Sequence, residues 1–167
     1  MMPDPDDPSW GSPFAARATF LHPDPDGVPD RPASAAEGEA LLARLEGAPA
    51  ELDAATAGVE EHRALAVLRN AMLWESWLAY AMDQLATGGA LAVGGNITMH
   101  LNGPPSVESF REGYAAQRSA NAATARERGP GLWAQAAGGR SRLTAHQVLA
   151  AIAALDAERL ALLREEG

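Results

Sequence analysis

Residues 59–85 read VEEHRALAVLRNAMLWESWLAYAMDQL, and apolar side chains cover most of the circumference of this segment when it is drawn as a helix. A helix with so little polar surface is usually the buried centre of a bundle. One polar strip at heptad spacing, formed by Arg69, Ser76 and Asp83, is expected to face solvent. We therefore predict a long central helix that begins between Glu51 and Val59 and ends at Leu85.

Local start signals predict three further helices around this centre. Sequences of the form Ser/Thr-x-x-Glu/Gln, which make capping boxes, occur at 34–37 and 144–147, and the sequence Pro-Pro-Ser at 104–106 precedes another periodic segment. We expect Gly47 to end the first of these helices. The chain is thus predicted to be all-α, with a single-domain bundle of about four main helices over residues 33–167. The three further helices are expected over residues 34–46, 106–128 and 144–165.

Two segments fall outside the helical pattern. Residues 1–32 contain 8 of the 12 prolines, so we expect an extended N-terminal arm that side chains such as Phe14 anchor to the body. Within residues 90–101, apolar residues alternate about a Gly-Gly-Asn turn. This pattern predicts a small β-hairpin, with a looser glycine-rich loop as the alternative.

Two missing residue types exclude whole classes of chemistry. The chain has no Lys, so Schiff-base catalysis and a Walker A phosphate loop are excluded. It also has no Cys, which excludes thiol nucleophiles, disulfides and thiolate metal sites. Any reaction would therefore use acid–base or electrostatic chemistry without a covalent Lys or Cys intermediate.

The charge of −9 is unevenly distributed along this acidic, Ala-rich chain. Residues 1–62 carry 13 acidic and 3 basic side chains, whereas residues 63–143 carry 5 acidic and 8 basic ones. The acidic total argues against nucleic acid as a partner, while the basic middle leaves room for a small anionic ligand. The sequence has no apolar run of about 18 residues, the length that would predict a membrane span. Its acidic start does not resemble a signal peptide. We expect a cytoplasmic protein without a membrane partner.

The histidines do not follow a metal-binding pattern. Neither Glu-x-x-His nor His-Glu-x-x-His occurs, so the helical di-iron and zinc motifs are absent. His62, His100 and His146 are scattered along the chain. We predict no metal site and no cofactor.

Polar side chains interrupt the apolar faces of the predicted helices. In the central helix, Asn70 falls between two tryptophans and Glu75 falls between Leu68 and Met82. A buried carboxylate must be paired or protonated. Glu75 could therefore form an ion pair with an Arg of a neighbouring helix, reach the surface, or serve a ligand site.

The helix over 106–128 shows the same feature more strongly. Tyr114 lies in its apolar stripe, and Arg111, Arg118 and Asn121 fall within the same arc. Such a face fits either a ligand site or a partner interface.

The last predicted helix carries Asp156 and Arg159 three residues apart within its apolar arc. They could form an intrahelical ion pair at the rim of the core, or Arg159 could bind an anion that Asp156 orients.

Together these features lead us to expect a small-molecule-binding helical protein, with isomerisation, cyclisation or dehydration of a small anionic substrate as its reaction if it is an enzyme. The alternative is a non-catalytic adaptor or regulatory subunit that uses the acidic arm and an Ala-rich helix face to bind a partner protein or form a homodimer. For Arg118 the alternative to ligand binding is an ion pair with a buried Glu75. The candidate catalytic residues are Glu75, His100 and Tyr114. The candidate ligand-binding residues are Asn70, Arg111, Arg118, Asn121 and Arg159.

Overall fold

The computed structural model of the chain describes residues 13–29, 33–87, 91–94, 101, 103–134 and 143–165. All regular secondary structure in these residues is helical, which confirms the all-α class. These residues contain six α-helices, of which four are long and two are short. The elements are α1 (Pro13–Phe20), a 3-10 turn η2 (Pro25–Gly27), α2 (Ala35–Thr56), α3 (Glu61–Thr87), α4 (Val107–Arg128), α5 (Pro130–Ala134) and α6 (Ala145–Arg164).

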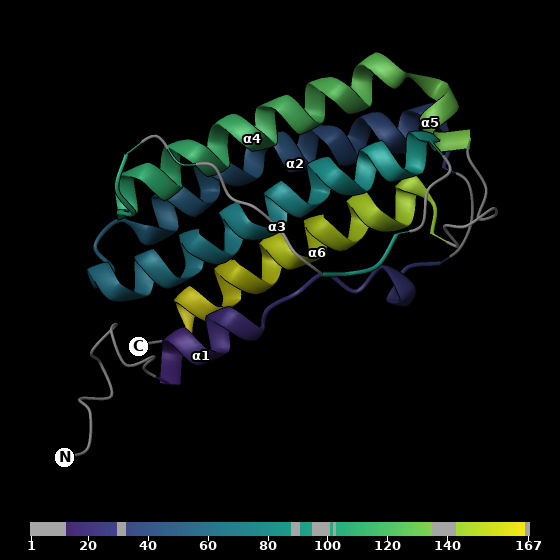
Figure 1. Ribbon diagram of the computed structural model, residues 1–167. Coiled ribbons are helices and arrows are strands. Elements are labelled where there is room, and N and C mark those ends of the chain that lie inside the picture. Colours follow the sequence, from purple (N-terminus) through teal and green to yellow (C-terminus); the bar gives the residue numbers. More distant parts are fainter. Residues whose placement is uncertain are drawn as a thin grey trace.

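The four long helices lie side by side, with α2 and α3 placed diagonally (Figure 1). Each of α2 and α3 packs against both α4 and α6, and α1 packs against α3. Helix α3 is buried on several sides, as its nearly continuous apolar surface requires. No helix among the described residues is long and apolar enough to cross a membrane.

The start signals in the sequence act as predicted. The Ser34 hydroxyl accepts a hydrogen bond from the Glu37 backbone N–H at 3.1 Å, and the Glu37 carboxylate accepts one from the Ser34 N–H at 3.3 Å. Thr144 and Gln147 form the same reciprocal pair at the start of α6. Ser106 caps α4. These contacts satisfy backbone donors that the first helical turn leaves unpaired.

The predicted end of the first long helix at Gly47 is wrong. Helix α2 continues through Gly47 and Pro49 to Thr56. An unbroken buried stripe packs against α4 and α6 on both sides of these residues, and this packing outweighs the poor helix propensity of Gly and Pro. The central helix accordingly begins at Glu61, later than predicted. The stripe consists of Leu42, Leu45, Ala48 and Leu52.

The predicted extended arm is also wrong over residues 13–20, which form α1. Phe14 and Ala18 are four residues apart, so they share one helical face, and both are buried. The Arg63 guanidinium carbon lies 4.9 Å from the centroid of the Phe14 ring and covers it. This contact and the apolar packing hold a short helix that could not persist alone.

The predicted hairpin falls largely outside the described residues. Residues 95–100, which contain the predicted turn's last two positions, are not among them. Residues 91–94 and 101 are described, and none of them is in a strand.

Candidate functional site

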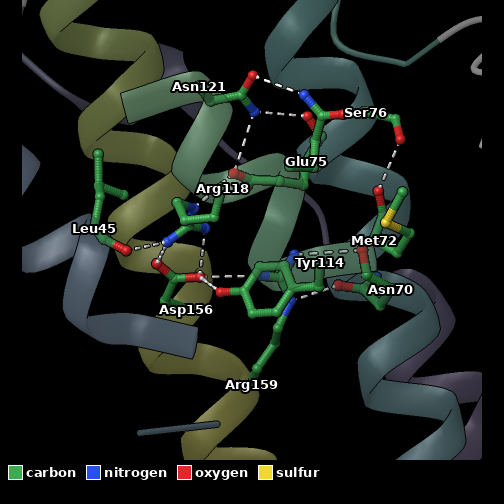
Figure 2. A network of polar contacts seen from close by, with 11 residues as sticks. Leu45, Asn70, Met72, Glu75, Ser76, Tyr114, Arg118, Asn121, Asp156 and Arg159 are labelled. Atoms are coloured by element: carbon green, nitrogen blue, oxygen red, sulfur yellow. Dashed lines mark hydrogen bonds and ion pairs between the residues drawn. The ribbon is translucent and has the colours of Figure 1, made fainter. Parts of the chain in front are cut away.

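Four charged side chains meet in the centre of the bundle (Figure 2). Glu75 comes from α3, Arg118 from α4, and Asp156 and Arg159 from α6. Side-chain exposure is 0% for Glu75, 1% for each arginine and 11% for Asp156. Two guanidinium groups and two carboxylates balance each other formally, which is the condition under which buried charges are tolerated. We call these four residues the ionic network.

Arg118 connects all four long helices. Its Nε donates to Glu75 Oε2 at 2.6 Å. Its Nη1 and Nη2 donate to the two oxygens of Asp156 at 2.8 and 3.0 Å, in the forked geometry that suits a carboxylate. Nη1 also donates to the backbone carbonyl of Leu45 in α2 at 2.8 Å. Four of the five N–H groups of this guanidinium are thereby used inside the protein.

The Leu45 carbonyl is available to Arg118 because of a proline four residues later. Pro49 has no N–H, so the carbonyl of Leu45 cannot make its normal helical hydrogen bond. A buried carbonyl without a donor is costly, and Arg118 supplies the missing donor from α4. Pro49 therefore creates the free carbonyl through which α2 contacts the ionic network.

Amides extend the network around Glu75. Asn121 Nδ2 donates to the backbone oxygen of Glu75 at 3.0 Å and to its Oε2 at 3.2 Å. Gln117 Nε2 donates to Asn121 Oδ1 at 3.0 Å. Oε1 of Glu75 is buried and has no hydrogen-bond partner among the described residues. Even so, two hydrogen bonds hold Asn121 against α3, and the contact with Gln117 of its own helix fixes the orientation of its amide.

A second amide connects the network to α1. Arg159 donates through Nε to Asn70 Oδ1 at 2.9 Å and through Nη1 to Asp156 Oδ1 at 2.9 Å. Asn70 Nδ2 in turn donates to the backbone carbonyls of Ala18 and Leu21, each at 2.9 Å. The end of α1 is thus fixed to α6 through a single side chain of α3.

Burial and neighbouring charges shift the pKa values of three groups in this region, Tyr114, Arg118 and Arg159. Burial acts to lower the pKa of Arg118, but the charges of Glu75 and Asp156 outweigh it and raise this pKa well above its ordinary value. Burial lowers the pKa of Arg159, although Asp156 lies beside it. Burial also raises the pKa of the Tyr114 phenol well above its ordinary value. Tyr114 therefore stays neutral, and it donates to Asp156 Oδ1 at 3.1 Å.

The structure brings most of the sequence-predicted site residues together, but they form hydrogen bonds and ion pairs with one another, whereas a ligand site was expected. Arg111 lies apart at the surface, where it forms ion pairs with Asp53 and Glu108. His100 lies outside the described residues. The residues that join the network are Asn70, Glu75, Tyr114, Arg118, Asn121 and Arg159.

Sequence reasoning identified the contact of Asp156 with Arg159 but missed the other partners of Asp156. Asp156 accepts four hydrogen bonds, from Tyr114, Arg118 and Arg159, whereas its spacing predicted a contact with Arg159 only. The Leu45 carbonyl was missed as well, although Pro49 was a visible signal for it.

A cavity of about 530 Å³ lies next to the network, on the other side of Asn70. Helices α1 and α3, the segment before α4 and the first turn of α4 form its walls. Its polar lining consists of four side chains, of which Arg69 and His62 are basic and none is acidic. Sequence reasoning missed this site, because it placed Arg69 on a solvated strip. The lining residues are Ala15, Thr19, His62, Leu65, Ala66, Arg69, Asn70, Leu73, Leu101, Pro105 and Phe110.

Two further cavities lie along α6. One, of about 470 Å³, includes Arg17, Glu158 and Glu165 in its lining, and the other, of about 210 Å³, includes Asp24 and Glu158. Within the described residues no group of three His, Asp or Glu side chains could hold a metal ion.

Comparison of the chain with protein-family models, with curated proteins and with solved structures gave no match. Two features of the described residues bear on function, the ionic network and the cavity beside α1 and α3.

Proposed function

We propose that the protein binds a small molecule in the cavity between α1, α3 and the start of α4. The observation that carries this proposal is the cavity itself. Its volume of about 530 Å³ lies within the range of ligand pockets, and seven of its eleven lining residues are apolar. The few polar groups would orient a ligand that is held mainly by apolar contact.

The ionic network is a poorer candidate for the ligand site. An anion could bind Arg118 only by displacing Glu75 or Asp156, and either carboxylate would then remain buried without its partner. Glu75, Tyr114 and Arg118 are each 2% exposed or less, so a substrate has no access to them in this arrangement. We assign the network a structural role.

Asn70 belongs to both features but offers the cavity little hydrogen-bonding capacity. Both N–H groups of its amide bind carbonyls of Ala18 and Leu21, and its oxygen accepts from Arg159. It therefore forms a fixed part of the wall. In this proposal the network and α1 together hold the cavity open and in shape.

Filling the cavity with a larger side chain tests the proposal. Ala66 lines it and is partly buried, so Ala66→Phe places an aromatic ring in the space that a ligand would use. The probe is N-phenyl-1-naphthylamine, a neutral dye whose fluorescence rises in apolar surroundings. We expect saturable binding to the unmodified protein and at least a tenfold loss of affinity in Ala66→Phe, with a change in unfolding free energy below about 1 kcal/mol.

The matched control is Ala161→Phe, which places the same ring in the cavity between α1 and α6. This variant should bind the dye like the unmodified protein. Equal dye binding by Ala66→Phe and the unmodified protein, or no saturable binding by either, would contradict the proposed site.

A further inference from the structure

We propose that the ligand of this cavity is an amphipathic anion, a small molecule with an apolar body and one carboxylate, sulfonate or phosphate group that Arg69 binds. This inference rests on the proposed function. It adds the chemical class of the ligand and names the residue that recognises its charge.

The first support is the sign of the charge around the cavity. Arg69 and His62 are its ionisable lining residues, and neither Asp nor Glu is among the described residues that line it. Each of the two cavities along α6 includes Glu158 and a second carboxylate, and the basic residues beside them are Arg17, which is paired with Glu165, and His22. An anion is therefore favoured beside α3 and repelled at the other two places.

The second support is the state of Arg69 itself. The basic residues that join neighbouring helices, such as Arg17, Arg111 and Arg126, form ion pairs with carboxylates. Arg69 forms no ion pair with any described residue and is exposed at the edge of the cavity. Its guanidinium offers forked donors that match the oxygens of a carboxylate, sulfonate or phosphate.

The third support is the division of polar and apolar surface along α3. His62 and Arg69 are seven residues apart, which corresponds to about 10 Å along a helix. Leu65 and Ala66 lie between them, and Phe110 of α4 also lines the cavity. His62 Nδ1 lies 3.5 Å from Glu60 Oε2, so part of its polarity is already used. Arg69 is consequently the principal anion donor, with an apolar surface beside it for the body of the ligand.

A pair of matched dyes tests the charge preference directly. 8-Anilinonaphthalene-1-sulfonate has the same aromatic body as N-phenyl-1-naphthylamine and adds one sulfonate. We expect the anionic dye to bind the unmodified protein about five- to tenfold more tightly, an effect between that of an exposed ion pair and that of a buried charge-assisted hydrogen bond. The protein carries a net charge of −9, so a general attraction of anions cannot produce this preference.

Arg69→Gln should lower the affinity for the anionic dye by the same five- to tenfold and leave the affinity for the neutral dye unchanged. Arg164→Gln is the matched control, because Arg164 is also exposed and forms no ion pair with a described residue, but does not line the cavity. It should change neither affinity.

The possible outcomes separate this inference from the proposed function. Two outcomes would overturn the anion preference while the cavity remained a binding site. In the first, the unmodified protein binds both dyes with equal affinity; in the second, Arg69→Gln loses affinity for both dyes. Failure of both dyes to bind the unmodified protein would instead overturn the proposed function. Sedimentation with phosphatidylglycerol vesicles distinguishes a lipid headgroup from a free anion: we expect the protein to stay in the supernatant, and Arg69-dependent sedimentation would overturn a free ligand.

Discussion

The ionic network and the neighbouring cavity both place arginine beside apolar side chains, yet the two arginines are in opposite states. Arg118 is 1% exposed and uses four N–H groups within the protein. Arg69 is exposed, forms no ion pair with a described residue and lines the cavity beside α1 and α3. In this molecule, polar residues within apolar stripes, such as Glu75 and Arg118, meet buried polar partners. A ligand site requires in addition that donors remain unused beside a void.

The network also has a consequence for how the helices are arranged. Burying two ion pairs carries a desolvation cost that apolar packing would avoid, so such groups do not by themselves explain stability. The forked contact between Arg118 and Asp156 does constrain how α4 and α6 meet, and Glu75 constrains α3. We infer that the network selects one packing of the long helices among several that apolar faces alone would permit.

The largest expected effect is a difference in unfolding free energy between variants of Arg118 and variants of Arg69. Arg118→Ala leaves Glu75 and Asp156 with fewer partners and the Leu45 carbonyl without its donor, so we expect a loss of about 3–5 kcal/mol in unfolding free energy. Arg69→Ala should change this quantity by less than about 0.5 kcal/mol, because its side chain is exposed and forms no ion pair with a described residue. Chemical denaturation monitored by tryptophan fluorescence measures both.

A loss below about 1 kcal/mol in Arg118→Ala would contradict the structural role of the network. If that variant does not fold, Arg118→Lys keeps the charge but loses the forked geometry. It should then show an intermediate loss of stability, whereas a ligand-binding role predicts unchanged stability.

Much of the helical framework could be predicted from the sequence because its signals are local. The capping boxes at Ser34 and Thr144 act within one turn, and α4 ends at Arg128, the last residue of the expected range 106–128. The course of α2 through Gly47 and Pro49 could not be predicted. Local propensity favoured a break there, and contacts with α4 and α6 overruled it.

The candidate site divides in the same way. Periodicity identified polar residues such as Glu75, Arg118 and Arg159 as misplaced on apolar faces, and the structure brings them together. Periodicity could not tell whether they meet one another or a ligand, because that depends on how three helices are placed. The cavity could not be predicted from the sequence, because α1 forms one of its walls and that segment was predicted to be extended.

Asn70 joins the two regions, and its removal should affect both. Asn70→Ala takes the donor from the carbonyls of Ala18 and Leu21 and the acceptor from Arg159. We expect a loss of about 2–3 kcal/mol in unfolding free energy, since buried groups lose their partners. Amide hydrogen exchange should accelerate mainly in α1, and dye binding should weaken as the α1 wall loosens.

Ser76→Ala is the control on the same helix, because the Ser76 hydroxyl donates only to the Met72 carbonyl one turn earlier. Its effect on stability should stay below about 0.5 kcal/mol, with exchange in α1 unchanged. Uniform acceleration of exchange throughout the Asn70→Ala variant, without a larger effect in α1, would show that Asn70 does not act through this helix.

The smallest expected effect is the coupling between Pro49 and Arg118. Pro49→Ala restores an N–H that can bind the Leu45 carbonyl, the group that Arg118 now satisfies. Alanine also raises helix propensity, but this benefit is the same with or without Arg118 and cancels in a double-mutant cycle. We expect Pro49→Ala to stabilise Arg118→Ala by about 1 kcal/mol more than it stabilises the unmodified protein, because only in that background does the carbonyl lack a donor. Urea denaturation of the four proteins measures the coupling. Additive effects within about 0.3 kcal/mol would mean that the Leu45 carbonyl is satisfied without Arg118, and that the network's contact with α2 contributes nothing to stability.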